Sequence, residues 1–169
     1  DHICGVRVRD GIFPEEGLQK LCAMARHRRV MVKLGPFQGL GDGEAPYLDL
    51  LPVIERIVDA FDPQVIVTHN LRGWGLAPWV VARRRGIPLV HVVHDYGLLC
   101  NTSTLWHHGA ECGAPCRLRA FRARSRWPGG LLIGVSEAVL AEHRLRDFGN
   151  DDPCAIIHPV AAAVAAAAA

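Results

Sequence analysis

The sequence predicts an α/β fold, with an open parallel sheet and helices on both faces. The first observation is an alternation along the chain: short runs of apolar, β-branched residues are followed by segments with helical spacing. The second is the run Ile87–Asn101, whose first part contains Leu, Val and His after Pro88 and carries no charge. Such a run is typical of a strand that is buried on both faces inside a parallel sheet.

The N-terminal part is predicted to form strands at Ile3–Val8 and Val30–Leu34 with a helix between them. Pro14–Glu16 suits the first turn of that helix, because proline is tolerated there and acidic side chains favour the positive end of the helix dipole. Arg26–Arg29 supply a basic last turn. The apolar residues at helical spacing are Leu18, Leu21, Cys22 and Ala25.

A glycine-rich segment, Gly35–Gly43, follows and is predicted to be a loop. It lacks the spacing and the lysine of a P-loop, so we interpret it as a connector rather than a phosphate site. A helix is expected from about Leu48 to Phe61, with one apolar face. Asp62-Pro63 ends it, and the next strand begins at Val65–Thr68. The apolar face consists of Leu50, Ile54, Ile57 and Phe61.

The next helix is predicted from about Leu76 to Arg85, with Pro78 in its first turn and Gly86 just past its end. Leu131–Val135 is predicted to be a strand that leads into a helix capped by Ser136. A last short strand is expected at Cys154–Ile157. The predicted apolar face of the capped helix is Ala138, Ala141, Leu145 and Phe148.

Residues 1–160 are therefore expected to form a single domain, and the alanine-rich tail at 161–169 carries no information. Four predicted strands end in polar residues: His69-Asn70, His94-Asp95, Ser136-Glu137 and His158. The carboxyl ends of parallel strands share one edge of a sheet, where ligands bind in open α/β folds. A single histidine there is more often structural, and Ser136 alone is more often a helix cap. Four such ends together favour a binding site.

Several functional classes are not supported. The nucleophile elbow G-x-S-x-G and the dinucleotide motif G-x-G-x-x-G are absent, and a net charge of +2 does not indicate nucleic acid binding. No apolar run approaches the length of a membrane span. Six scattered cysteines favour a reducing cytoplasm. Histidine and asparagine side chains at the strand ends suit a polyhydroxylated ligand, because they donate and accept hydrogen bonds.

The segments THNLRGWGLAPWVVARRRGIPLVHVVHDYGLLC, LLIGVSEAVL and AIIHPV resemble the N-terminal half of family 4 glycosyltransferases over about Phe61–Val160. The resemblance implies a Rossmann-like domain, one half of a GT-B fold. It implies that this half binds mainly the acceptor, which is a sugar, a lipid-linked molecule or a small molecule. A C-terminal domain would bind the nucleotide-sugar, which is a co-substrate. Transfer would retain the anomeric configuration without a metal cofactor, and the present chain alone is expected to be inactive.

The resemblance also implies roles for individual residues. His94 matches the catalytic histidine that faces the transferred sugar, and Asp95 would hold either that imidazole or the following loop. His69, Asn70, Arg72 and Tyr96 would line the acceptor side, and Ser136 and Glu137 would lie at the rim of the cleft. Two alternatives remain open: a GT-B nucleotide-sugar epimerase, and a non-catalytic sugar-binding or regulatory domain.

Two further features lie between Asn101 and Trp127. Cys100, Cys112 and Cys116 have C-x11-C-x3-C spacing, with His107 and His108 between the first two, which leaves a metal site, a disulfide and free thiols open. The arginines of Arg117–Arg126 alternate with apolar residues. That segment is either a basic helix that contacts the inner face of an anionic membrane or an exposed connector, and nucleic acid is not expected as its partner.

Overall fold

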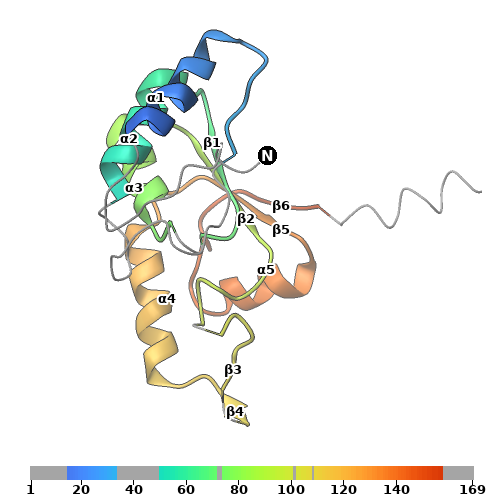
Figure 1. The fold of residues 1–169 in the computed structure, drawn as a ribbon. Helices are drawn as coiled ribbons and strands as arrows, with labels where there is room; N and C mark the ends of the chain where they lie inside the picture. The colour runs from blue at the N-terminus through green and yellow to red at the C-terminus, as the bar shows by residue number, and fades with distance from the viewer. Residues whose placement is uncertain (1–14, 34–49, 72–73, 101, 108, 158–169) are drawn as a thin grey trace, which may run out of the picture. The chain divides into compact units, whose positions relative to one another are not determined.

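The computed structural model describes residues 15–33, 50–71, 74–100, 102–107 and 109–157. The chain divides into two compact units. Unit 1 comprises residues 1–66 and 71–87, and unit 2 comprises residues 67–70 and 88–169. The helices and strands are labelled in Figure 1.

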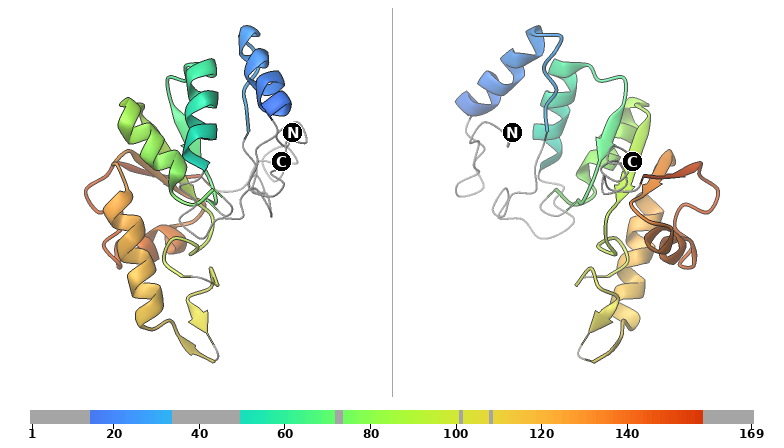
Figure 2. Two further views of the ribbon diagram at one scale, coloured as in Figure 1. Left: turned by 60° about the vertical axis from the view of Figure 1, so that its left-hand side comes forward. Right: turned by 90° about the vertical axis from the view of Figure 1, so that its right-hand side faces the viewer.

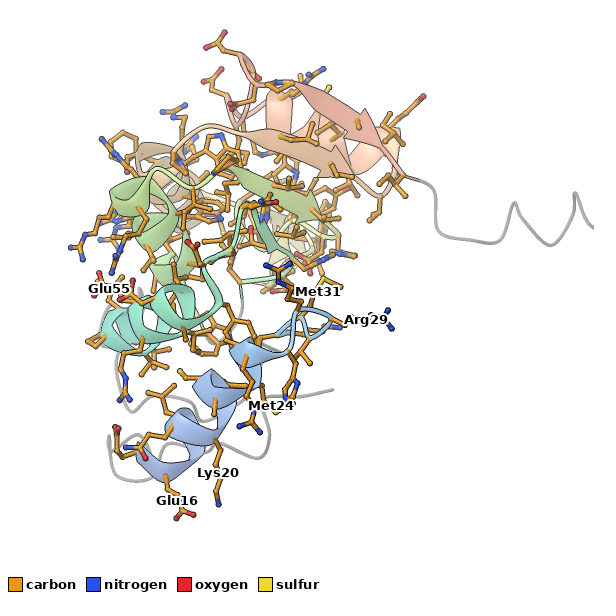
Figure 3. The ribbon with its side chains drawn as sticks, turned by 90° about the horizontal axis from the view of Figure 1, so that it is seen from above. Glu16, Lys20, Met24, Arg29, Met31 and Glu55 are labelled. Carbon is orange, nitrogen blue, oxygen red and sulfur yellow. The ribbon has the colours of Figure 1, made fainter. Side chains whose placement is uncertain are left out.

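Unit 1 is a helical layer. It contains α1 (Glu15–Ala23), η2 (Met24–Arg26), α2 (Leu51–Phe61) and α3 (Ala77–Arg85). The apolar faces of α1, α2 and α3 form one core, to which Leu18 and Leu21 of α1 contribute together with Ile54 and Ile57 of α2. Polar residues line the outer side of α1, where Glu16 and Lys20 pair at 2.5 Å (Figure 3). The sequence predicted α1, α2 and α3 and the inward faces of α1 and α2.

The helix ends follow the local chemistry of the sequence. Asp62 ends α2 with a φ of 42°, and Gly86 ends α3 with a φ of 64°, so both residues are left-handed caps. The basic end of α3 is exposed, and two of its arginines bind carboxylates of α2: Arg84 pairs with Glu55 at 3.1 Å, and Arg85 pairs with Asp59 at 2.8 Å.

Unit 2 is built on the sheet. Within the described residues, β1 (Ile66–Thr68), β2 (Leu89–Val93), β5 (Leu131–Gly134) and β6 (Cys154–Ile156) form a four-stranded sheet in the order β1-β2-β5-β6. β5 pairs in parallel with both β2 and β6. Together with the flanking helices, these strands confirm the predicted α/β fold with a parallel sheet.

The remaining elements of unit 2 are α4 (Ala114–Arg126), α5 (Glu137–Arg144) and a short hairpin of β3 (Trp106–His107) and β4 (Ala110–Glu111). The hairpin leads into the N-terminal end of α4 in each view (Figures 1 and 2). Only Val135 and Ser136 separate β5 from α5, and Gly134 allows these two elements to approach closely. A Cβ atom at Gly134 would lie 2.9 Å from Cβ of Leu140 and 3.0 Å from the carbonyl oxygen of Ser136.

Two predictions were wrong. Residues 30–33 are not a strand, and the Met31 side chain is 93% exposed (Figure 3). A β-branched run becomes a strand only when a neighbouring strand takes up its hydrogen bonds, and no described strand pairs with this segment. Ala138, Ala141 and Leu145 do not form the buried face of α5 either.

The buried residues of α5 are Leu140 and His143, whereas Leu145 is 76% exposed. The helix ends at Arg144, so Leu145 falls in the following turn. Phe148 is buried, but it lies beyond the helix. The reason is that the position of β5 decides which side of α5 is covered, and alanine gives little preference for either side.

The predictions for Ile3–Val8, Gly35–Gly43, Arg72, His158 and the C-terminal tail lie outside the described residues. No helix in the described ranges is both long enough and apolar enough to cross a lipid bilayer.

Candidate functional site

The ends of β1 and β2 bring two histidines together in unit 2. Nδ1 of His69 lies 2.9 Å from Nε2 of His94, so one ring donates a hydrogen bond to the other. The ring centroids are 5.2 Å apart, and both side chains are exposed. Each histidine is the first residue after its strand, which is why neighbouring strands place them side by side.

The next residue on each strand forms a second pair. Nδ2 of Asn70 donates to Oδ2 of Asp95 at 3.0 Å. The other oxygen, Oδ1 of Asp95, accepts from the backbone N–H of Gly97 at 2.7 Å. Glycine fits here because a Cβ atom at position 97 would lie 2.8 Å from Oδ1 of Asp95. Asp95 therefore joins the end of β1 to the turn that follows β2.

Tyr96 and Ser136 belong to the same edge of the sheet. Val93 is in register with Gly134, so the residues after β2 and β5 leave the sheet at the same level. Tyr96 stacks on His143 of α5 with ring centroids 6.2 Å apart. The Ser136 hydroxyl accepts from the backbone N–H of Val139 at 3.3 Å, so it caps α5 as predicted, and Glu137 is exposed in the first turn.

A buried polar pair lies beneath this edge. Oγ1 of Thr68 is 2.8 Å from Nδ1 of His91, and both side chains are buried in the sheet. Burial, and the nearby charges that His143, His69 and His94 would carry, lower the pKa of His91 to about 3. His91 is therefore neutral near pH 7. It holds the two strands together below the exposed histidines.

His143 is also buried and neutral. Its Nδ1 lies 2.8 Å from the carbonyl oxygen of Val139, which can only accept, so Nδ1 carries the proton. Burial lowers the pKa of this imidazole, although the bond to Val139 opposes the shift. Nε2 of His143 is the buried side-chain polar atom without a hydrogen-bond partner within the described ranges. The ring packs between Tyr96 and Phe148 instead.

The structure thus brings together His69, Asn70, His94 and Asp95 from two strands, with Tyr96 beside them. Ser136 and Glu137 stand at the same sheet edge, and Arg72 is not described. The sequence interpretation missed Thr68, His91, Gly97 and His143. The position of His91 inside the apolar run of β2 could have indicated that this histidine is buried in the sheet. Nothing in the local pattern marked His143, because the buried face of α5 was assigned to other residues.

The three cysteines that the sequence singled out also come together, although they are up to 16 positions apart along the chain. Sγ atoms of Cys100, Cys112 and Cys116 all lie within 4.8 Å of one another. All three are free thiols in the structure. Among the described histidines, cysteines and carboxylates, these three thiols are the group whose ligand atoms lie close enough together to hold one metal ion.

Comparison with known families agrees with this architecture. A family model described as a glycosyl transferase 4-like domain matches residues 5–159, which includes every element of the sheet and all of the paired strand ends. Searches of curated proteins and of solved structures gave no significant match. Since the family model covers most of the chain, the protein belongs to the glycosyl transferase 4-like domain family.

Proposed function

We propose that this domain forms the acceptor side of a retaining glycosyltransferase, and that a further nucleotide-sugar-binding domain supplies the donor. The observation that carries the proposal is the convergence of the His69–His94 and Asn70–Asp95 pairs at the carboxyl edge of the sheet. His69, His94 and Asn70 are exposed, and their side chains both donate and accept hydrogen bonds, which suits sugar hydroxyls. Membership in a glycosyl transferase 4-like family supports the same chemistry.

His94 would be the residue that faces the transferred sugar. Glycosyl transfer passes through an oxocarbenium-like state in which positive charge develops at the anomeric carbon. A neutral imidazole that bonds a sugar hydroxyl can hold the ring in place and present its lone pair towards that charge. His69 would orient the His94 ring through their shared hydrogen bond.

Asp95 would be a positioning residue for the loop after β2. Its two oxygens are occupied by Asn70 and by the N–H of Gly97, which favours the loop-holding role over a bond to the imidazole. Tyr96 would then be fixed on the acceptor side, because it follows Asp95 directly and stacks on His143. In the same proposal, Arg72 completes the acceptor side, and Ser136 and Glu137 form the rim.

The test is sugar transfer by the intact protein with His94→Ala. We expect kcat to fall by about 10²-fold or more, because one preorganised electrostatic contact is lost from the transition state. His94→Gln keeps a hydrogen-bonding side chain and should recover part of that loss. His27→Ala is the matched control, because His27 is an exposed histidine outside the site. Full activity in His94→Ala would remove His94 from the mechanism.

The same measurements separate the alternatives. An intact protein that binds sugars but neither transfers nor isomerises them would be a non-catalytic sugar-binding domain. Isomerisation of a nucleotide-sugar without an acceptor would identify an epimerase. Both results would contradict the proposed transfer.

We also propose that α4 contacts the cytoplasmic face of an anionic membrane, where a lipid-linked acceptor would be found. Leu118 and Phe121 are 51% and 54% exposed, although both are large apolar side chains on a helix. Arg117 and Arg122 are exposed on the same helix. Apolar residues flanked by arginine are typical of helices that lie in a membrane interface.

Co-sedimentation with vesicles tests this contact. The wild-type protein should bind vesicles that contain anionic phospholipid and should not bind neutral ones. Leu118→Asn with Phe121→Asn should weaken binding about tenfold or more, since two apolar contacts with the bilayer are lost. Leu145→Asn is the control, because Leu145 is an exposed apolar residue of a different segment. Equal binding of both variants would refute the membrane proposal.

A further inference from the structure

Three cysteines from separate segments of unit 2 meet at one point. Cys100 closes the turn after β2, Cys112 directly follows β4, and Cys116 lies in the first turn of α4. Sγ of Cys100 lies 3.0 Å from Sγ of Cys112, and all three sulfur atoms fall within 4.8 Å of one another. Cys100 and Cys116 are buried, and Cys112 is partly exposed, so the cluster is accessible from one side.

Backbone hydrogen bonds fix each of the three positions. The N–H of Cys100 donates to the carbonyl oxygen of Tyr96, and the N–H of Cys112 donates to that of Leu105. The N–H of Cys116 donates to the carbonyl oxygen of Gly113, which caps α4. The fold therefore holds the three sulfur atoms close together before anything binds. An ion that contacts all three would require little rearrangement of the backbone.

We propose that Cys100, Cys112 and Cys116 bind one zinc ion as a structural site with three thiolate ligands. A zinc–sulfur bond of about 2.3 Å and tetrahedral angles place the sulfur atoms about 3.8 Å apart. The separations in the structure, from 3.0 Å to no more than 4.8 Å, bracket that value. The fourth ligand would be a water molecule or another side chain.

Binding would release the three thiol protons to solvent and leave a zinc–thiolate group with a net charge of −1. The position of the cluster favours that charge, because it stands at the N-terminal end of α4, where the helix dipole is positive.

A disulfide accounts for the cluster less well. A bond of about 2.05 Å between Cys100 and Cys112 would use two of the thiols and leave Cys116, a buried sulfur in the same group, without a role. A zinc ion uses all three.

The site would join the hairpin and α4 to the turn that also contains Tyr96, whose N–H donates to the carbonyl oxygen of Ser103. This inference concerns folding and metal content, and it does not depend on the proposed transfer reaction.

The direct test measures metal in the wild-type chain, purified under reducing conditions and without added metal. We expect about one zinc per chain by mass spectrometry. Replacing zinc with Co²⁺ should produce sulfur-to-cobalt charge-transfer absorption that saturates at about one Co²⁺ per chain. Chelation should lower the melting temperature of the wild-type protein. None of these three results depends on the folding of a variant.

Variants then assign the ligands. Cys112→Ser alters the partly exposed member of the cluster, and it should reduce bound zinc by about tenfold or more and abolish the charge-transfer band. Cys154→Ser is the control, because Cys154 is an exposed thiol outside the cluster, and it should retain the metal. Metal-free wild-type protein without a cobalt band, full zinc content in Cys112→Ser, or a Cys100–Cys112 disulfide under reducing conditions would each overturn the proposal.

Discussion

Acid should destabilise the folded protein through His91, and the size of the effect follows from the burial of this side chain. His91 is 2% exposed, and its pKa lies near 3 in the folded chain, against 6.5 for an exposed histidine. Between these values the unfolded chain binds a proton that the folded chain does not bind. The free energy of unfolding therefore falls as the pH falls, and the full contribution of neutral His91 is present only above about pH 6.5.

The slope for one such group is about 1.4 kcal/mol per pH unit. Lowering the pH from about 7.5 to 5.0 crosses about 1.5 units of that window, so His91 should remove about 2 kcal/mol of stability. The lowered pKa of His143 acts in the same direction, since that side chain is also buried and neutral. Carboxylates titrate mainly below this range, so they contribute less to the difference between these two pH values.

The assay is urea unfolding at both pH values, followed by tryptophan fluorescence, because Trp127 packs against His91. His91→Gln removes the titrating group while keeping an amide that can bond to Thr68. The variant should lose about 2 kcal/mol less than the wild type between the two pH values, whatever its stability at pH 7.5. An equal loss in both proteins would refute the reasoning, because a neutral buried His91 requires a difference.

Two further predictions concern packing in unit 2, and each has a matched control. Gly130→Ala should destabilise the protein by about 2 kcal/mol or more, because a Cβ atom there would lie 2.2 Å from the carbonyl oxygen of Leu89 at a φ of 148°. Gly113→Ala places its Cβ atom in open space and should cost less than about 1 kcal/mol, so similar melting temperatures for the two variants would contradict the first prediction. Leu132→Ala should cost about 2–5 kcal/mol in urea unfolding, because Leu132 is fully buried in β5. Leu145→Ala, at an exposed position, should change stability by less than about 0.5 kcal/mol, and equal losses would mean that β5 is not part of the core.

The candidate site was predicted in outline from four strand ends. Two of these, at His69-Asn70 and His94-Asp95, contact each other as the parallel arrangement requires. The histidine at 158 lies outside the described residues, so its place at the edge stays a prediction. The pairing of His69 with His94 and of Asn70 with Asp95 was not predictable, because the order and register of β1 and β2 decide which side chains meet.

The sequence by itself determined the elements whose signals are local. Proline at the first turns, glycine or aspartate at the ends, and a serine cap at position 136 act over a few consecutive residues, so they can be read without knowledge of the fold. The alternation of apolar runs and helical segments determined the α/β class for the same reason.

Only the tertiary structure decided which segments find partners. Residues 30–33 have the composition of a strand but do not form one, and α5 buries Leu140 and His143 rather than the alanines. Likewise, three cysteines spread over 17 positions lie close together because the β3–β4 hairpin and the first turn of α4 bring them to one point. Strand pairing, burial and clustering depend on groups that are distant in the chain, and their free energy arises only when the chain has folded.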